Sequence, residues 1–272
     1  MLEVRILGCG SSGGVPRLGG PGEAGDWGAC DPANPKNRRT RCSLLVRRKS
    51  AAGETRVLVD TSPDLREQLL AAKVARLDGV LITHNHADQL HGMDDLRVVT
   101  LASGKRSDVY ADTATMDGVM EKFGYCFRQP PGSDYPPILN SKIIPESLAP
   151  FEVAGEGGTI PVQAFGQGHG RIRSLGFRFG PLAYSSDVDR LDEEAFSVLS
   201  GVKIWIVDAL RHTAHPSHAH LAQTLEWIAR VKPARAILTH MHIDMDCAAL
   251  TATLPPGVEP GFDGQTLSIP LD

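Results

Sequence analysis

The chain has 272 residues, of which 42% are hydrophobic and 22% are charged, and its formal net charge at pH 7 is −4. This length allows a substantial buried core, and the mildly acidic balance disfavours nucleic acid and anionic membranes as partners. The amino terminus reads as a strand and not as a signal peptide, and no apolar run reaches membrane-spanning length, so we expect a cytoplasmic protein. The five cysteines form no close CxxC pair, which indicates reduced thiols.

The first half of the chain begins with an apolar strand, Leu2–Leu7, that ends in a glycine turn. A polar loop rich in glycine and proline then continues to about Arg41, and a loop of this length inside a domain is typically functional or disordered. The hydrophobic patterns that follow predict two short strands, a helix, a buried strand and a strand–helix unit, at residues 42–48, 55–62, 63–75, 77–83, 108–112 and 113–124.

The second half starts after a proline-rich surface excursion at residues 125–137. Its patterns predict three strands, a short helix, a strongly apolar strand, an amphipathic helix and a last buried strand, at residues 157–167, 172–180, 182–187, 193–200, 202–210, 216–232 and 235–242. With no repeat or linker, the sequence predicts one layered α/β domain spanning residues 1–272.

Ligand-type side chains gather at the predicted strand ends. His84, His86 and Asp88 lie at alternate positions in "HNHAD", directly after a buried strand. An isolated HxH reads equally well as a surface loop, but His169 and Asp187 also follow strand-like runs, and so does His240. Imidazole and carboxylate together suit zinc, manganese or iron, so these side chains predict a metal cradle.

The order of these motifs resembles the metallo-β-lactamase superfamily over essentially the whole chain. The stretches "GCGSSGGVPR", "LVDTSPDLR" and "HGMDDLR" are similar to one branch of it. That branch contains the phosphoribosyl cyclic phosphodiesterase of phosphonate breakdown and lies near pyrroloquinoline-quinone biosynthesis protein B and tRNase Z. The resemblance implies a four-layer αβ/βα sandwich, in which two mixed β-sheets are covered by outer helices.

The resemblance also implies two sets of ligands for zinc or manganese. One ion would be held by His84, His86 and His169, and a second by Asp88, Asp187 and His240, with Asp187 bridging the two. Such ions, about 3.5–4 Å apart, share a hydroxide that serves as the nucleophile.

The dinuclear members of the family read HxHxDH, whereas Gln89 follows Asp88 in this chain. A carboxamide is a weaker ligand than imidazole, so we expect a tight first site and a weak second one. The amino-terminal loop offers only Cys30, with Cys42 beyond it, and we therefore expect no structural zinc there.

The predicted helix 216–232 places His218 in its first turn, pointing inward. The resemblance implies that His218 acts as the general acid, and we take His218 and Asp88 as the catalytic residues. Three residues are expected to support the ligands without touching a metal: Asp60, Asp208 and His91. Expected substrate contacts are His215, Ser12, Arg17 and Arg97, and the run "KNRRTR" adds Arg38, Arg39 and Arg41 as phosphate candidates.

The leading hypothesis is a metal-dependent phosphodiesterase acting on a small cyclic or nucleotide-like phosphodiester. A lactone or thioester hydrolase using the same metal site is a second reading, and a non-hydrolytic binding or biosynthetic protein is a third. The absence of a basic arm disfavours tRNA processing. The oligomeric state is open, with a homodimer among the alternatives.

Overall fold

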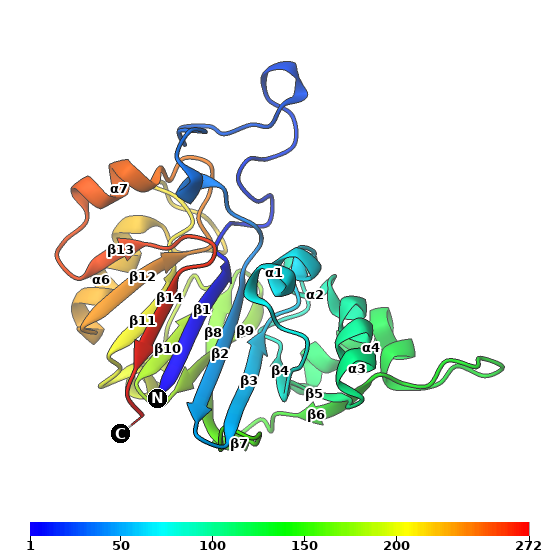
Figure 1. Ribbon diagram of the computed structural model, residues 1–272. Coiled ribbons are helices and arrows are strands. Elements are labelled where there is room, and N and C mark those ends of the chain that lie inside the picture. Colours follow the sequence, from blue (N-terminus) through cyan, green and yellow to red (C-terminus); the bar gives the residue numbers. More distant parts are fainter. Residues whose placement is uncertain (272) are drawn as a thin grey trace.

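Two seven-stranded sheets lie face to face in the computed structural model, which describes residues 1–271 (Figure 1). In the first sheet the order is β14 (Thr266–Ile269), β1 (Leu2–Gly8), β2 (Ser43–Ser50), β3 (Gly53–Val59), β4 (Gly79–Leu81), β5 (Ser107–Ala111) and β6 (Leu139–Ile143). In the second it is β13 (Val258–Pro260), β12 (Arg235–Thr239), β11 (Ile204–Asp208), β10 (Leu182–Ser185), β9 (Ile172–Phe179), β8 (Ile160–His169) and β7 (Phe151–Val153).

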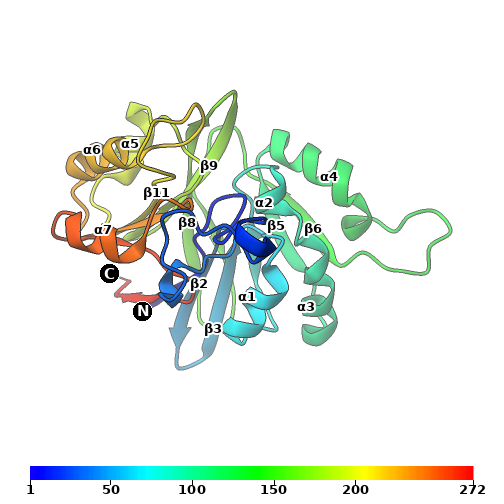
Figure 2. The same ribbon diagram turned by 90° about the horizontal axis from the view of Figure 1, so that it is seen from above.

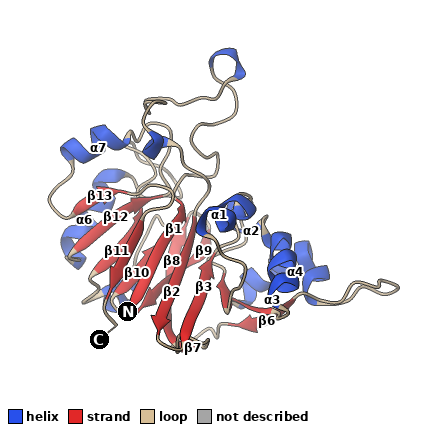
Figure 3. Cartoon of the chain, viewed as in Figure 1, coloured by secondary structure: helices blue, strands red, loops and turns tan. Residues whose placement is uncertain are grey.

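Helices cover the outer faces of both sheets (Figure 3). On the first sheet lie α1 (Leu65–Ala72), α3 (Leu96–Ser103) and α4 (Thr113–Phe127), and on the second lie α5 (Glu193–Leu199), α6 (Leu221–Val231) and α7 (Cys247–Thr253) (Figure 2). A single turn, α2 (Ala87–Leu90), follows β4. The expected four-layer αβ/βα sandwich is therefore confirmed. None of the described helices has both the length and the apolarity needed to span a membrane.

The alternation of side chains along each strand explains the two cores. In β2, Leu44 and Val46 are fully buried between the sheets, whereas Leu45 is buried under the helices of the first sheet. Successive side chains of a strand point to opposite faces, so a strand covered on both sides reads as a continuous apolar run. The run "SLLV" is such a case.

Both sheets change from antiparallel to parallel pairing, and this change places the site. Strand β3 is antiparallel to β2 but parallel to β4, and β10 is antiparallel to β9 but parallel to β11. The carboxyl ends of parallel strands meet at the same edge of a sheet. The loops that follow β3, β4, β8, β10, β11 and β12 therefore gather at one end of the molecule.

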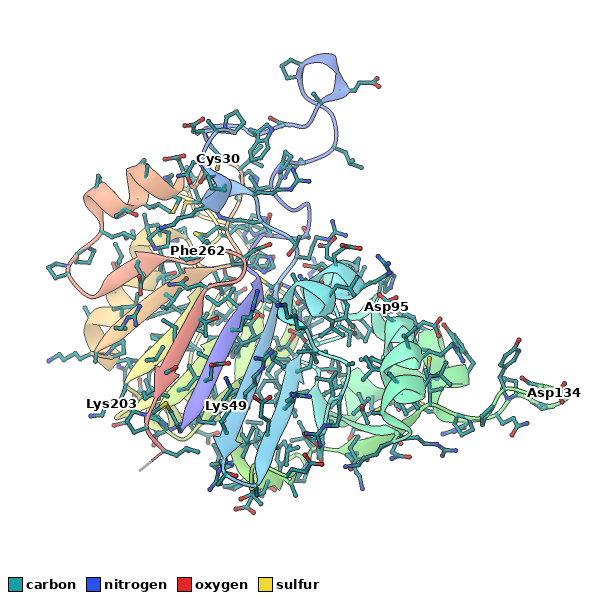
Figure 4. The ribbon with its side chains drawn as sticks, in the orientation of Figure 1. Cys30, Lys49, Asp95, Asp134, Lys203 and Phe262 are labelled. Carbon is teal, nitrogen blue, oxygen red and sulfur yellow. The ribbon has the colours of Figure 1, made fainter. Side chains whose placement is uncertain are left out.

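The long loop between β1 and β2 rises from that same end (Figure 1). Figure 4 places Cys30 of this loop above the sheets, and Lys49 and Lys203 at their opposite end. A buried guanidinium anchors the loop, because Arg39 donates from Nη2 to the Met245 carbonyl at 2.7 Å. Arg39 is thus committed to the fold and does not contact a phosphate.

Candidate metal centre

The six predicted ligands are brought together by strand ends. His84 follows β4, His169 is the last residue of β8, and His240 directly follows β12. Asp187 lies two residues beyond β10. His86 directly precedes the α2 turn, and Asp88 is the second residue of that turn. Three groups of potential ligand atoms, each within 4.8 Å of one another, result: His84, His86 and His169; Asp88, Asp187 and His240; and His169, Asp187 and His218. The first two are the predicted ligand sets.

Asp187 faces both predicted sets. Its Oδ1 lies 3.9 Å from His84 Nε2 and 4.0 Å from His169 Nε2, and its Oδ2 lies 3.1 Å from His240 Nδ1. Burial opposes ionisation of Asp187, but the charge of His240 holds its pKa well below the ordinary value. An ionised carboxylate between two sets of nitrogens can bridge two cations.

The backbone at this end is held in a conformation that side-chain-bearing residues rarely adopt. Asp60, Asp187 and His240 all have positive φ, of 62°, 53° and 57° respectively. Such conformations cost on the order of 1–3 kcal/mol each, persist only where the surrounding structure enforces them, and cluster at functional sites.

A buried relay fixes the orientation of His84. The Thr83 hydroxyl donates to both carboxylate oxygens of Asp60 at 3.0 Å, and it lies 3.0 Å from His84 Nδ1. Because the single hydroxyl proton goes to Asp60, Thr83 accepts from Nδ1–H, which leaves the lone pair on Nε2. That nitrogen is buried and has no hydrogen-bond partner, and burial lowers the pKa of His84 to about 3, so the ring is neutral at pH 7.

His169 is oriented in the same way. Its Nδ1 lies 2.6 Å from the carbonyl oxygen of Ser217, so Nδ1 carries the proton and Nε2 the lone pair. Burial lowers the pKa of His169, and its Nε2 lies 3.2 Å from Nδ1 of His86. Nε2 of His84 and Nε2 of His169 both present lone pairs, and the nitrogens of His86 lie beside them, so the His84, His86 and His169 set fits a divalent metal.

The second set is more acidic and contains one amide. Burial, followed by the neighbouring Asp187 carboxylate, raises the pKa of Asp88. Burial opposes a charge on His240, but the Asp187 carboxylate holds its pKa well above the ordinary value. Nδ1 of His240 is buried without a hydrogen-bond partner, since Asp187 Oδ2 lies near it but outside the hydrogen-bond direction.

Gln89 is fully buried between the two carboxylates of this set. Its Nε2 donates to Asp187 Oδ2 at 2.9 Å and to Asp88 Oδ2 at 3.2 Å, while its Oε1 has no partner. The amide therefore presents hydrogens, not lone pairs, to the oxygens that a second ion would use.

His218 and Asp208 form a pair beside the ligands. Nδ1 of His218 lies 2.9 Å from Asp208 Oδ2, which also accepts from the backbone of Val188. The His218 ring stacks on His240 with centroids 4.6 Å apart and meets His169 edge-on at 4.7 Å. His218 therefore lies beside the candidate ligands.

The predicted helical position of His218 is wrong. Helix α6 begins at Leu221 with His220 as its N-cap, and His218 belongs to the preceding loop. This loop bonds to other segments, since Ala219 donates to Val188 O at 2.6 Å and accepts from Leu210 at 2.9 Å. Tertiary pairing of this kind replaces the local hydrogen bonds of a first helical turn.

Of the remaining predicted residues, some lie close to the candidate ligands and others lie away from them. His215 lies near, with its ring 5.2 Å from that of His218, and Asp60 lies behind His84 as described. His91 is exposed, with its ring edge-on to Phe123, and therefore does not support a ligand. Arg97 is paired with Asp94 at 2.7 Å on the surface and lines neither of the two cavities that reach the candidate ligands.

The sequence did not reveal two groups that orient the candidate ligands, the Thr83 hydroxyl and the Ser217 carbonyl. Thr83 is adjacent to a ligand, but the strand it extends gave no sign that its side chain points to Asp60. A backbone carbonyl has no sequence signal at all.

Two cavities flank the centre. One of about 540 Å³ reaches Asp88 and is lined by Ser12, Gly13, Pro16, Arg17, Leu18, Arg41, Pro63 and Ala87. The other, of about 340 Å³, reaches His84 and is lined by Asn85, Asp112, Ala114, Thr115, Glu146, Ile172 and Arg173.

Comparison of the sequence with known proteins identifies a family and several relatives. Residues 55–241, which include all six candidate ligands, match the family described as a beta-lactamase superfamily domain. An octanoyltransferase of Porphyromonas gingivalis (strain ATCC BAA-308 / W83) is 32% identical over 266 residues, covering 97% of this chain and 51% of that protein. Coenzyme PQQ synthesis protein B of Xanthomonas axonopodis pv. citri (strain 306) is 30% identical over 170 residues, covering 57% of this chain and 53% of that protein. The matches thus cover only about half the length of these curated relatives.

Solved structures give the same fold. A new diphosphatase from the PhnP family superposes with a TM-score of 0.85 at 29% identity, covering 98% of this chain and 96% of that one. Zinc-bound PqqB from Methylobacterium extorquens superposes with a TM-score of 0.71 at 18% identity, covering 98% and 100%. The short form of human tRNase Z does so with a TM-score of 0.64 at 16% identity, covering 99% and 100%.

Proposed function

This chain belongs to the beta-lactamase superfamily, and on that basis we propose that it is a metal-dependent phosphodiesterase acting on a small cyclic or nucleotide-like substrate. The observation that carries the proposal is the convergence of the three-histidine set on Asp187, beside an imidazole, His218, that is held by its own carboxylate. The similarity to a diphosphatase supports cleavage of a P–O bond.

The donor set suits zinc or manganese. His84, His86 and His169 would hold the first ion, and Asp88, Asp187 and His240 the second. A divalent ion bound there supplies Lewis acidity toward a phosphoryl oxygen and lowers the pKa of water toward neutrality. The chain's own contribution is to keep His84 and His169 neutral and to fix their Nδ1 protons, so that both Nε2 lone pairs are free for the first ion.

We assign unequal affinities to the two positions. A second ion has to displace the hydrogen bonds that Gln89 donates to Asp88 and Asp187, whereas the first meets the Nε2 lone pairs of His84 and His169. After dialysis against dilute chelator, the wild-type protein should keep about one equivalent of metal, and Gln89→His should keep closer to two. Two equivalents held equally firmly by the wild type would contradict this assignment.

His218 would protonate the leaving alkoxide. Asp208 accepts from Nδ1 and fixes the ring, which leaves Nε2 as the nitrogen that can transfer a proton. His218 is only partly buried and stacks on the imidazole of His240. It therefore lies where it can reach the leaving group of a substrate bound at the ligands.

Hydrolysis of an acyl ester, thioester or lactone is the second candidate. The observation that favours it is the similarity to a protein named octanoyltransferase, although this chain corresponds to only about half of that protein. A strained lactone needs less help from an acid than a phosphodiester does, so the His218–Asp208 pair weighs toward phosphodiester cleavage.

The test is a side-by-side assay after loading with manganese or zinc. Bis(p-nitrophenyl) phosphate should be hydrolysed with a higher kcat/KM than a lactone or p-nitrophenyl octanoate. The exposed residue His91 provides a matched control, because His91→Ala should not change either activity. Turnover of the acyl substrates alone would favour the second candidate, and no turnover of any substrate would contradict both.

A further inference from the structure

The side of strand β8 that faces away from β9 is paired only near the two ends of the strand. Its first residues, 160–162, pair with β7, and Gly168 near its end forms a bridge with Arg190. Figure 1 shows β7 at the bottom of the sheets, so most of β8 extends beyond it. Between these points, within residues 1–271, Ala164 and Gly166 pair with β9 on one side and with no strand on the other. An open edge of this kind presents backbone groups that can pair with another chain.

The bonds of Gly168 show which backbone groups face this open edge. Its amide donates to Arg190 O at 2.9 Å and its carbonyl accepts from the Asp189 amide at 2.8 Å, so both groups point away from β9. The amide and carbonyl of one strand residue point to the same side, and those of the residues two and four positions away do so too. The backbone groups of Gly166 and Ala164 therefore face the open edge.

Three of these four backbone groups have no partner among the described residues. The Ala164 carbonyl accepts from Gln163 Nε2 at 3.0 Å, whereas both amides and the Gly166 carbonyl bond to no other group in residues 1–271. Ala164 is 1% exposed, so its amide is a buried donor without an acceptor. Buried amides of this kind are rare and cost stability. The Ala164 amide is thus placed for an acceptor that comes from outside the fold.

A cavity of about 840 Å³ runs along this edge. It is lined by residues 163–168 of β8, by residues 146–148 of the loop before β7, and by three apolar side chains at or near α5: Leu191, Ala195 and Val198. A Cβ on Gly166 would meet a single atom within 4 Å, Arg173 Cδ at 3.5 Å, so another backbone can approach closely there. The cavity therefore combines an open strand edge with an apolar wall, which suits an extended chain.

The charge of this cavity selects the kind of chain that fits it. Three carboxylates line it: Glu146, Asp192 and Glu194. Both of its guanidiniums are already paired with a carboxylate outside the lining. Arg173 bonds to Asp112 at 2.9 Å, and Arg190 pairs with Asp189 at 2.8 Å. The remaining charge is negative, so the cavity repels anions and attracts cationic side chains.

We propose that the open edge of β8 binds an extended peptide segment with basic side chains, which adds a strand to the second sheet. An antiparallel segment would exchange two hydrogen bonds with Gly166 and accept a third from the Ala164 amide. Its side chains alternate between two faces, so some pack on the apolar wall while lysine or arginine side chains pair with the carboxylates. This docking site goes beyond the proposed hydrolytic function and does not depend on it.

The first test is a fluorescence anisotropy titration of the full chain with two labelled peptides of about seven residues. One alternates lysine with valine and the other alternates glutamate with valine, in about 0.15 M salt, which screens nonspecific attraction. The basic peptide should bind saturably and the acidic one should not. Equal binding of the two peptides, or no binding of the basic one, would overturn the inference.

Two pairs of variants locate the bound peptide. Gly166→Pro removes the amide at the open edge, where proline is tolerated in a strand, and should weaken binding at least about tenfold, while Gly166→Ala keeps the amide and should lose less than about threefold. Glu194→Gln should weaken binding about two- to fivefold. Its matched control is Glu193→Gln, since Glu193 is exposed, adjacent and outside the cavity lining. Thermal melting confirms that each variant is folded.

Amide hydrogen exchange gives a readout that nonspecific charge attraction does not move. The bound basic peptide should slow exchange of the Ala164 and Gly166 amides, while the Phe165 amide, which faces β9, should change little. This measurement uses the wild type and therefore decides the question even if Gly166→Pro does not fold. Unchanged exchange at both amides, or undiminished binding by folded Gly166→Pro, would overturn the inference. A wild-type dimer that Gly166→Pro dissociates, without peptide binding, would overturn it in favour of a second copy of the chain.

Discussion

Replacing Thr83 by valine should weaken metal binding although Thr83 is not a ligand. The side chains have the same shape, so the change removes only the hydroxyl that joins Asp60 to His84 Nδ1. Without it, Nδ1–H of His84 has no acceptor, and the ring gains by moving its proton to Nε2, which removes the lone pair that faces the metal position.

The magnitude follows from the contacts that are lost. Asp60 keeps the backbone amide of Thr83 at 2.8 Å but loses both hydroxyl contacts, and all three side chains are at most 1% exposed. A buried polar group left unsatisfied costs about 1–3 kcal/mol, and about 1.4 kcal/mol corresponds to a tenfold change in an equilibrium constant. The affinity for the first ion should therefore fall about 10- to 100-fold, the range found when a partner that orients a ligand imidazole is removed.

The assay is competition for zinc with a chromophoric chelator of known affinity. Thr239→Val is the matched control, because Thr239 is also fully buried and also precedes a ligand, His240, but its hydroxyl contacts the Cys42 thiol at 3.5 Å and not a carboxylate. The control should lose less than about threefold in affinity, as expected for one weak neutral contact. Equal losses in the two variants, or no loss in Thr83→Val, would refute the relay.

Two other perturbations test the acid and a distant buried carboxyl. Asp208→Asn should lower kcat about 10²- to 10⁴-fold for a substrate with an alkyl leaving group, because a poor leaving group needs the proton that His218 supplies. Hydrolysis of a substrate that releases p-nitrophenolate, and the metal content, should change little. Equal losses of kcat for both leaving groups would argue against general-acid catalysis. Burial raises the pKa of Asp263 to about 6, above its unfolded value, so the folded state binds the extra proton, and the stability this gives is present at pH 4 and lost as the pH rises through 6. Urea titrations of wild type and Asp263→Asn should therefore show their difference in unfolding free energy changing by about 2 kcal/mol between pH 4 and pH 7, and a pH-independent difference would contradict the shift.

The sequence predicted the layers, and it predicted which side chains the fold brings together as candidate ligands, because both leave strong local signals. Apolar runs of strand length, such as the one ending at His240, reveal buried strands, and the ligands lie directly after them. The short edge strands β6, β7, β13 and β14 were missed, since the exposed residues of β6, for example, carry no such run.

Features that depend on tertiary contacts were outside the reach of sequence patterns. The apolar stripe of α6 continues the spacing back to His218, but the pairing of Ala219 with Val188 prevents a helix there. The motif around His91 suggested a role beside the ligands, whereas the end of α2 turns its ring toward Phe123. The direction of the Gln89 amide is likewise set by carboxylates, one of them 98 residues away.

The most direct test measures bound transition metal and phosphodiester hydrolysis together in His169→Ala. His169 is 83 residues from His86 in the sequence, yet their facing nitrogens are 3.2 Å apart. If these strand ends hold one catalytic ion, His169→Ala loses both the metal and the activity, and His91→Ala keeps both. A folded His169→Ala protein with wild-type metal content and undiminished hydrolysis would contradict the account.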